Sequence, residues 1–119
     1  MLRKNKKNST QMEDNYVNII RSVVAAAAGK TEGVASITDE AGSVLNNVSG
    51  SVKTDNKSIR VDIINDAVTI ELSINAYDTM TIPKLVCTLQ ENIKRDVEKA
   101  TQYRVKAINV SIVGVVFTS

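Results

Sequence analysis

Apolar and polar positions alternate along this chain with a helical period in some stretches and a strand period in others. Residues 13–29 carry apolar side chains three and four positions apart, which predicts an amphipathic helix that ends near Gly29. Its stripe comprises Tyr16, Ile20, Val23 and Ala27, flanked by Ile19 and Val24. The start stays open by several residues because two kinds of cap are available: Thr10 with Glu13 as a capping box, or Asp14 and Asn15.

A second and stronger helix is predicted after Thr81, which suits a helix cap. Pro83 then falls in the first turn, where its missing N–H would have had no partner. The apolar stripe of this helix consists of Ile82, Leu85, Val86, Leu89, Ile93, Val97 and Ala100. Cys87 lies off the stripe, so we expect it to be an incidental residue on the helix flank.

Three stretches follow the period of a β-strand. Residues 59–64 and 67–76 each place apolar side chains at every second position, and Asn65 and Asp66 between them favour a tight antiparallel hairpin. The intervening positions Thr69, Glu71, Ser73 and Asn75 are polar, which indicates a solvated face of the sheet. The third strand lies in residues 106–119, where Ile108, Val110 and Ile112 alternate with polar residues.

Together these elements predict the α+β class: a single small domain of αββαβ order. Two helices pack on one face of a three-stranded mixed sheet, since a two-stranded hairpin alone would be a poor platform for them. We assign residues 13–119 to this domain and interpret the Ser-, Gly- and Asn-rich residues 35–57 as a variable surface loop, with a short helical turn at 41–46 as an option. Residues 1–12 are interpreted as a basic, flexible N-terminal arm.

Charge separates the arm from the rest of the chain. Arg3, Lys4, Lys6 and Lys7 place four of the 15 basic side chains in the first seven residues, so 11 remain against 13 acidic ones. The arm is either a solubilising tail or a contact with anionic lipid or another polyanion, at about 1 kcal/mol for each basic residue near a membrane surface. No apolar run approaches the roughly 20 residues that a membrane span requires, and no secretion signal follows the arm.

The sequence offers no constellation for catalysis, a cofactor or a metal. It contains no histidine and one cysteine, and it lacks a paired-carboxylate pattern and the phosphate-binding glycine motifs. We therefore expect a non-enzymatic protein without catalytic, cofactor-binding or metal-binding residues. A single cysteine is also compatible with a reducing compartment, which favours the cytoplasm.

Nucleic-acid binding is disfavoured. The chain is only 3% aromatic, whereas RNA-binding sheets present exposed aromatic side chains, and no GXXG loop is present. Basic residues gather near the end of the second predicted helix, but cations there also complement the helix dipole. Binding of a polyanion, or a regulatory adaptor role, is kept as the alternative function.

The last stretch, "KAINVSIVGVVFTS", carries few features that protect a sheet edge. After Lys106 it has no charge and no proline, and Val113, Val115, Val116 and Phe117 continue apolar beyond the alternation. We predict that these four residues form an edge for self-association or for a partner. The alternative is that residues 115–117 fold back over a helix end.

The order of elements and several short motifs resemble the alkaline shock protein family of bacterial envelope-stress proteins. The first predicted helix closes in "EGV", a "VDI…VTIELSI" hairpin follows, and the last third shows Ile82-Pro83, Gln90 with Ile93, Val97-Glu98 and "INVSIVGV". The resemblance runs from about residue 13 to 117. A usual "MTG" before the last strand corresponds here to Ala100-Thr101-Gln102, so that connection lacks its glycine.

The resemblance implies a small cytoplasmic protein without catalytic activity, of Gram-positive type bacteria. Members of the family typically lie at the cell membrane through a membrane-anchored partner, self-associate, and help to maintain the envelope under stress. On this basis we expect a homo-oligomer that is peripheral at the cell membrane, acts in the envelope stress response, and makes at most a weak contact with anionic lipid.

Overall fold

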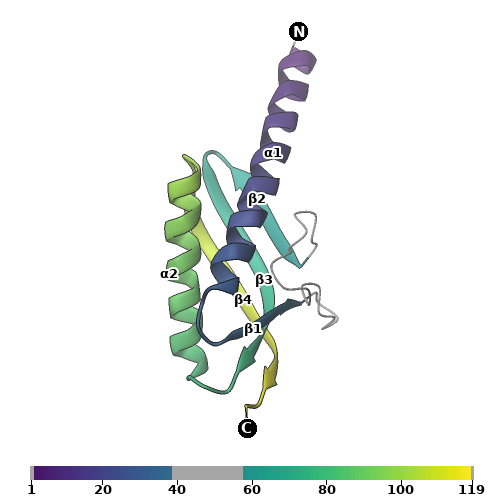
Figure 1. Cartoon of the computed structure of the whole chain (residues 1–119). Coiled ribbons are helices and arrows are strands. Elements are labelled where there is room, and N and C mark those ends of the chain that lie inside the picture. The colour runs from purple at the N-terminus through teal and green to yellow at the C-terminus, as the bar shows by residue number, and fades with distance from the viewer. Residues whose placement is uncertain (1, 39–57, 119) are drawn as a thin grey trace.

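The computed structural model describes residues 2–38 and 58–118, with side chains from residue 15 onward. Its elements follow the order α1 (Leu2–Gly29), β1 (Val34–Thr38), β2 (Ile59–Ile64), β3 (Ala67–Tyr77), α2 (Ile82–Ala100) and β4 (Arg104–Val116). Figure 1 shows one layer of strands with the two helices in front of it, which is the α+β class that the sequence predicts.

Strand β3 is the centre of a mixed sheet. β4 runs parallel to it along its whole length, from Ala67 paired with Arg104 to Tyr77 paired with Val116. β1 and β2 are both antiparallel to β3 and must therefore share its other flank. They lie end to end there, because Thr38 of β1 pairs with Ser73 and Ile59 of β2 pairs with the next residue, Leu72.

The predicted hairpin between β2 and β3 is confirmed. Ile64 pairs with Ala67, which leaves Asn65 and Asp66 as the two turn residues. Their φ angles are 50° and 67°, in the left-handed region that asparagine and aspartate tolerate better than most residues. These two side-chain types therefore explain why the chain reverses at this point.

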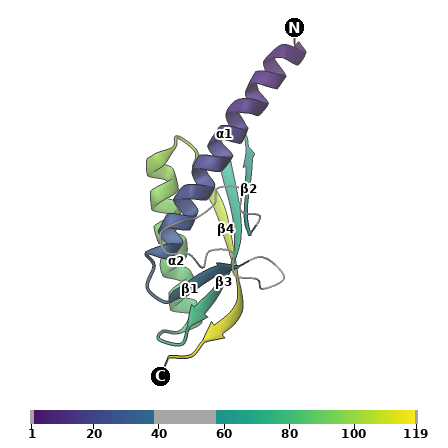
Figure 2. The ribbon, with the colours of Figure 1, turned by 45° about the vertical axis from the view of Figure 1, so that its right-hand side comes forward.

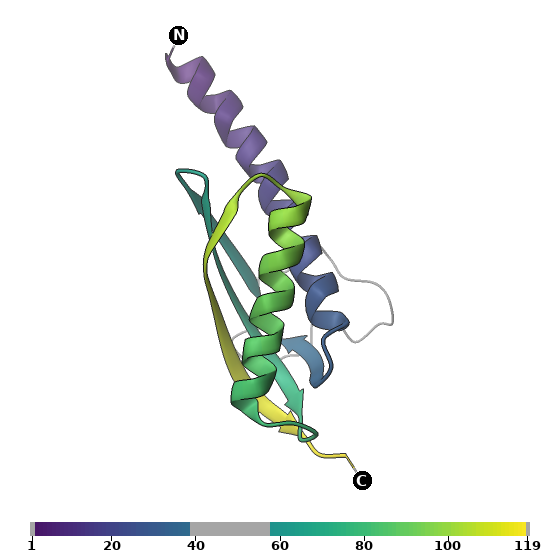
Figure 3. The ribbon, with the colours of Figure 1, turned by 90° about the vertical axis from the view of Figure 1, so that its left-hand side faces the viewer.

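Both helices cover one face of the sheet, as Figure 3 shows from the side. The core between the layers is aliphatic, which matches the composition. Its completely buried side chains include Ile20 and Val24 from α1, Ile59, Val68, Ile70 and Ile74 from the sheet, and Leu85, Leu89, Ile93 and Val97 from α2. Two members of the predicted α2 stripe, Ile82 and Ala100, are exposed because they lie at the helix ends, beyond the core.

The N-terminal part differs from the prediction. Helix α1 begins at Leu2, so residues 2–12 continue the predicted helix, and none of the proposed caps starts it. The flexibility of this basic segment stays a prediction. Figures 1 and 2 show this first part projecting beyond the edge of the sheet. The hydrophobic pattern does not reveal it, because these polar residues have no apolar stripe to pack against the body.

The described sheet has four strands rather than three, because all of β1 except Val34 falls in the stretch predicted to be a loop. Ile37 and Thr38 of β1 are buried against the domain, although the strand is short and contains small and polar residues. Its stability comes from pairing with β3, a contact distant in sequence that local composition does not reveal. The remainder of the predicted loop, including the optional helical turn at 41–46, lies outside the described residues.

Helix α2 connects to β4 without the glycine of the family motif. Thr101 is buried and ends the helix, its N–H donating to the Val97 carbonyl at 3.0 Å and its hydroxyl to the same oxygen at 2.9 Å. The Tyr103 N–H then donates to the Thr101 hydroxyl oxygen at 3.2 Å. The threonine hydroxyl thus builds the turn that lacks the family's glycine.

Candidate interaction edge on strand β4

Strand β4 lies at an edge of the sheet, as expected of the last strand of the chain. Among the described residues it pairs only with β3. Ile108, Val110 and Ile112 turn toward the core, and Asn109 and Ser111 are exposed on the other face. An edge strand presents N–H and C=O groups that a further strand can use.

Side chains of α2 occupy the first half of this edge. The Gln90 side-chain N–H donates to the Ile108 carbonyl at 2.8 Å, and the Glu98 carboxylate accepts from the Val105 N–H at 2.9 Å. Both bonds satisfy backbone groups that point away from β3. This role of the two side chains was not predicted from the sequence, because it depends on how α2 lies along β4.

The second half of the edge has no such cover from the residues that the structure describes. No side chain in the described parts of the chain bonds to the backbone between Asn109 and Ile112. The N–H and C=O groups of successive residues point to alternate sides of a strand. Because the Ile108 carbonyl points away from β3, the N–H and C=O groups of Val110 and Ile112 also point away from β3. These two residues leave their outer N–H and C=O groups available for pairing.

The four residues predicted to form the association edge come directly after this stretch, and all are exposed. Val113 and Val115 are 43% exposed, Val116 is 42% exposed and Phe117 is 79% exposed. Residues 115–117 therefore do not cover a helix end, which was the alternative interpretation. Exposed apolar side chains that follow an open strand edge are typical of a surface that contacts another protein.

A β-bulge shapes the end of β4. The register with β3 shifts between Ile112 and Gly114, so Val113 is the extra residue. Gly114 faces Asn75, and a Cβ at this glycine would lie 2.7 Å from the Asn75 Oδ1. The Asn75 Nδ2 donates in turn to the Ser36 Oγ at 3.1 Å. The glycine therefore allows β4 to lie close to the asparagine that links β3 to β1.

The chain beyond β4 is held by Asp78. The Thr118 N–H donates to the Asp78 Oδ1 at 3.2 Å and the Thr118 hydroxyl donates to the same oxygen at 2.9 Å. These two bonds, the backbone one first, hold the pKa of the Asp78 carboxyl below its ordinary value of 3.8. The exposed Phe117 thus lies between the end of β4 and Thr118, which Asp78 holds in place.

The opposite flank of the sheet is better protected against pairing. The Arg21 Nε of α1 donates to the Ile59 carbonyl at the start of β2, at 3.0 Å. β2 also carries the exposed charged residues Arg60 and Asp62, and charges on an edge strand oppose pairing with another chain. Among the described residues, β2 is therefore better protected against pairing than the second half of β4.

Two hollows lie beside β4. One, of about 270 Å³, is a groove between α2 and the first half of β4, lined on the helix side by Cys87, Gln90, Glu91 and Lys94. We call it the α2–β4 groove. The other, of about 280 Å³, is on the open face of the sheet around Arg60, Glu71 and Ser111. Arg60 and Glu71 are directly opposed residues of β2 and β3 and carry opposite charges.

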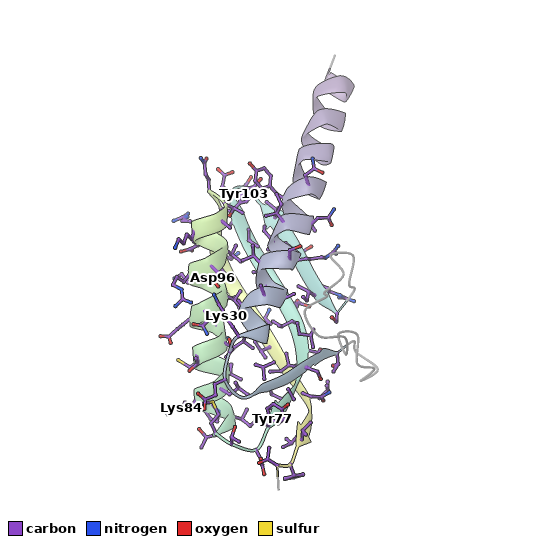
Figure 4. All side chains as sticks on the ribbon, in the orientation of Figure 1. Lys30, Tyr77, Lys84, Asp96 and Tyr103 are labelled. Atoms are coloured by element: carbon purple, nitrogen blue, oxygen red, sulfur yellow. The ribbon has the colours of Figure 1, made fainter. Side chains whose placement is uncertain are left out.

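An ion pair joins the two helices on the far side of α2 from this edge. The Lys30 Nζ lies 2.9 Å from the Asp96 Oδ2, and Figure 4 shows the two side chains meeting between α1 and α2. The hydrogen bond from Lys30 holds the pKa of Asp96 below its ordinary value. The pair is partly exposed, so its contribution to stability is small.

Arg3, Lys4, Lys6 and Lys7 fall in the first turns of α1, and their side chains lie outside those described. Their contact with an anionic surface stays a prediction. In residues 2–38 and 58–118 no group of three or more His, Cys, Asp or Glu side chains is arranged to hold a metal ion. Within the same residues, neither helix combines the length and the apolar character that crossing a membrane requires.

Two helices on one face of a mixed sheet, with β4 paired only to β3 among the described residues, define a small α+β domain. Its family follows from comparison with known proteins. The model of the alkaline shock protein 23 family, described as having a cell envelope-related function, matches residues 3–117. The chain belongs to this family, which confirms the resemblance to the alkaline shock proteins.

One relative is the protein YqhY of Bacillus subtilis (strain 168), described as uncharacterized. It is 28% identical over 99 residues, which cover 83% of this chain and 73% of YqhY. Among solved structures, a variant of the MamM CTD has a TM-score of 0.47 and 14% identity, and the match covers 81% of this chain and 94% of that one. A zinc form of the MamM CTD has the same TM-score, 13% identity, and coverages of 92% and 89%. Scores of this size mark a partial likeness, and no function is inferred from them.

Proposed function

We propose that this protein is a non-enzymatic, self-associating member of the alkaline shock protein family that acts near the cell membrane in the envelope stress response. The family supports the envelope-related part of this function. The observation that carries the proposal is the open second half of β4, followed by four exposed apolar residues. A membrane-anchored partner would bring the assembly to the membrane, as the family resemblance implies.

The test of self-association compares two equivalent substitutions. Val116→Lys places a charge on the apolar edge, whereas Ile64→Lys places one on an equally apolar, 68% exposed residue at the hairpin on the other flank. We expect static light scattering to show a smaller species for Val116→Lys and for truncation after Gly114, with native-like circular dichroism, and no change for Ile64→Lys. An unchanged oligomer with an intact fold in both variants would place the interface elsewhere.

The site of action is tested by capture of partners from membrane and nucleoid fractions of the same cells. The proposal expects a membrane-anchored protein in the membrane fraction that depends on the intact β4 edge. Recovery from the nucleoid fraction alone would favour the alternative, a polyanion-binding or regulatory adaptor. The same comparison would show whether the protein is peripheral at the membrane.

A further inference from the structure

The open part of the β4 edge is short and has defined limits. At one end the Ile108 carbonyl is already bonded to Gln90, and at the other the bulge at Val113 breaks the regular alternation. Between these limits the outer backbone groups belong to Val110 and Ile112. Ser111 lies midway between them, so the available hydrogen-bonding groups are symmetric about this residue.

We propose that a second copy of this chain pairs with β4 in antiparallel orientation, with Ser111 on the two-fold axis. In this register Val110 of one copy exchanges both backbone hydrogen bonds with the partner's Ile112. By symmetry, Ile112 of the first copy does the same with the partner's Val110. Such an interface is isologous, because the same surface is used on both copies. The inference rests on the proposed self-association and specifies its geometry.

The charge of the segment favours a second copy as the occupant. No charged residue occurs between Ala107 and Thr118, so two identical segments can lie side by side without facing like charges. The two helices of each copy then remain on the same face of an enlarged sheet. Pairing also converts the uncovered stretch of β4 into an interior strand, which removes the edge.

The same register gives Phe117 a place. Counted outward from Ser111, and with one residue added for the bulge at Val113, the partner's Phe117 lies opposite Val105 and Lys106, where the register of β4 with β3 shifts a second time. Lys106 and its neighbour Val105 line the α2–β4 groove, a hollow of about 270 Å³ with no occupant from the described residues. Phe117 is 79% exposed in a single copy, and burial of an aromatic side chain in a pocket is a common anchor of protein interfaces. Each copy therefore completes the groove of the other.

The axis is tested by cysteine cross-linking in a Cys87→Ser background. Cα atoms of a directly opposed, non-hydrogen-bonded pair are roughly 4.5 Å apart, within the range of a disulfide. We expect Ser111→Cys, oxidised with copper phenanthroline, to give a covalent dimer on a non-reducing gel. Lys106→Cys is the control, because it is exposed on the same strand but far from the axis, and we expect it to give no covalent dimer.

The groove is tested with the native cysteine retained. Cys87 lines the α2–β4 groove and is exposed, so Phe117→Cys should form an intermolecular disulfide with it, which mass spectrometry of the dimer band can identify. Phe117→Ala should raise the dissociation constant of the dimer at least about tenfold in sedimentation equilibrium, the loss expected for a buried aromatic anchor. Ile64→Ala is the matched control and should leave the constant unchanged.

The outcomes separate this inference from the proposed function. A wild-type chain that is monomeric at every concentration overturns both. An oligomer with native circular dichroism but no cross-link at Ser111 leaves self-association standing and overturns the two-fold axis on β4. A cross-link at Ser111 together with an unchanged dissociation constant for Phe117→Ala supports the axis and overturns the role of the groove.

Discussion

Replacement of Gly114 by alanine tests the close approach of β4 to β3. The new Cβ would lie 2.7 Å from the Asn75 Oδ1, which is closer than two such atoms can remain. Asn75 must rotate and give up its 3.1 Å hydrogen bond to Ser36. Loss of the hydrogen bond costs about 0.5–1.5 kcal/mol of stability. The strained side-chain torsion of the displaced Asn75 costs about 0.5–1.5 kcal/mol more. Alanine also lowers the conformational entropy of the unfolded chain relative to glycine, which stabilises the folded protein by about 0.4–1 kcal/mol. The net destabilisation is roughly 0.5–2 kcal/mol.

A double-mutant cycle in urea, followed by circular dichroism, distinguishes this clash from a general effect of alanine on the strand. In an Asn75→Ala background the obstructing oxygen is absent, so Gly114→Ala should become neutral or stabilising. Gly29→Ala serves as the control, because a Cβ added at this glycine would have no atom within 4 Å, and it should be neutral or stabilising in both backgrounds.

A change of sign between the two backgrounds is therefore the expected result. If Gly114→Ala destabilises the protein equally with and without Asn75, the contact between these two residues is not the cause. That result would mean that Gly114 does not lie as close to Asn75 as the 2.7 Å separation implies.

Three further predictions concern the core, the charged helix end and the tail. Leu89→Ala removes a completely buried side chain and should cost about 2–5 kcal/mol; an unchanged urea midpoint would mean that α2 packs through another face. Deletion of residues 1–8 should leave stability intact, since this part of α1 projects from the body, and should weaken binding to anionic vesicles at low salt; equal binding by both forms would remove the membrane role of the basic residues. The lowered pKa of Asp78 means that its bonds to Thr118 are present above pH 3.8 and are lost as the pH falls through the lowered value, so the Thr118 amide resonance should titrate there, and should not in Asp78→Asn.

The parts of the fold that local periodicity governs could be predicted from the sequence. The stripe that contains Leu89 and Ile93 and the alternation in β2 and β3 each place one set of side chains on a buried face, so pattern and structure agree. β1 escaped prediction because Val34–Thr38 is short, has no clear alternation and is stabilised by distant residues of β3. The first turns of α1 escaped because no apolar stripe marks them.

The candidate edge was predicted in position but not in extent. A last strand with few charges indicates an edge, and β4 pairs only with β3 among the described residues. Val113, Val115, Val116 and Phe117 are exposed, and their role in association stays a prediction. Which part of the edge is available depends on the side chains of Gln90 and Glu98, which reach β4 from a helix. A one-dimensional pattern cannot show this, because the contact arises from the crossing of α2 over the strand.

The arrangement of β1 and β2 has a consequence for how this domain can vary. Thr38 and Ile59 pair with consecutive residues of β3, so β1 and β2 together line one flank of β3 although they are separate in sequence. The boundary between the two pairings accordingly falls between Leu72 and Ser73, so a shift in the register of one of these strands does not require a shift in the other.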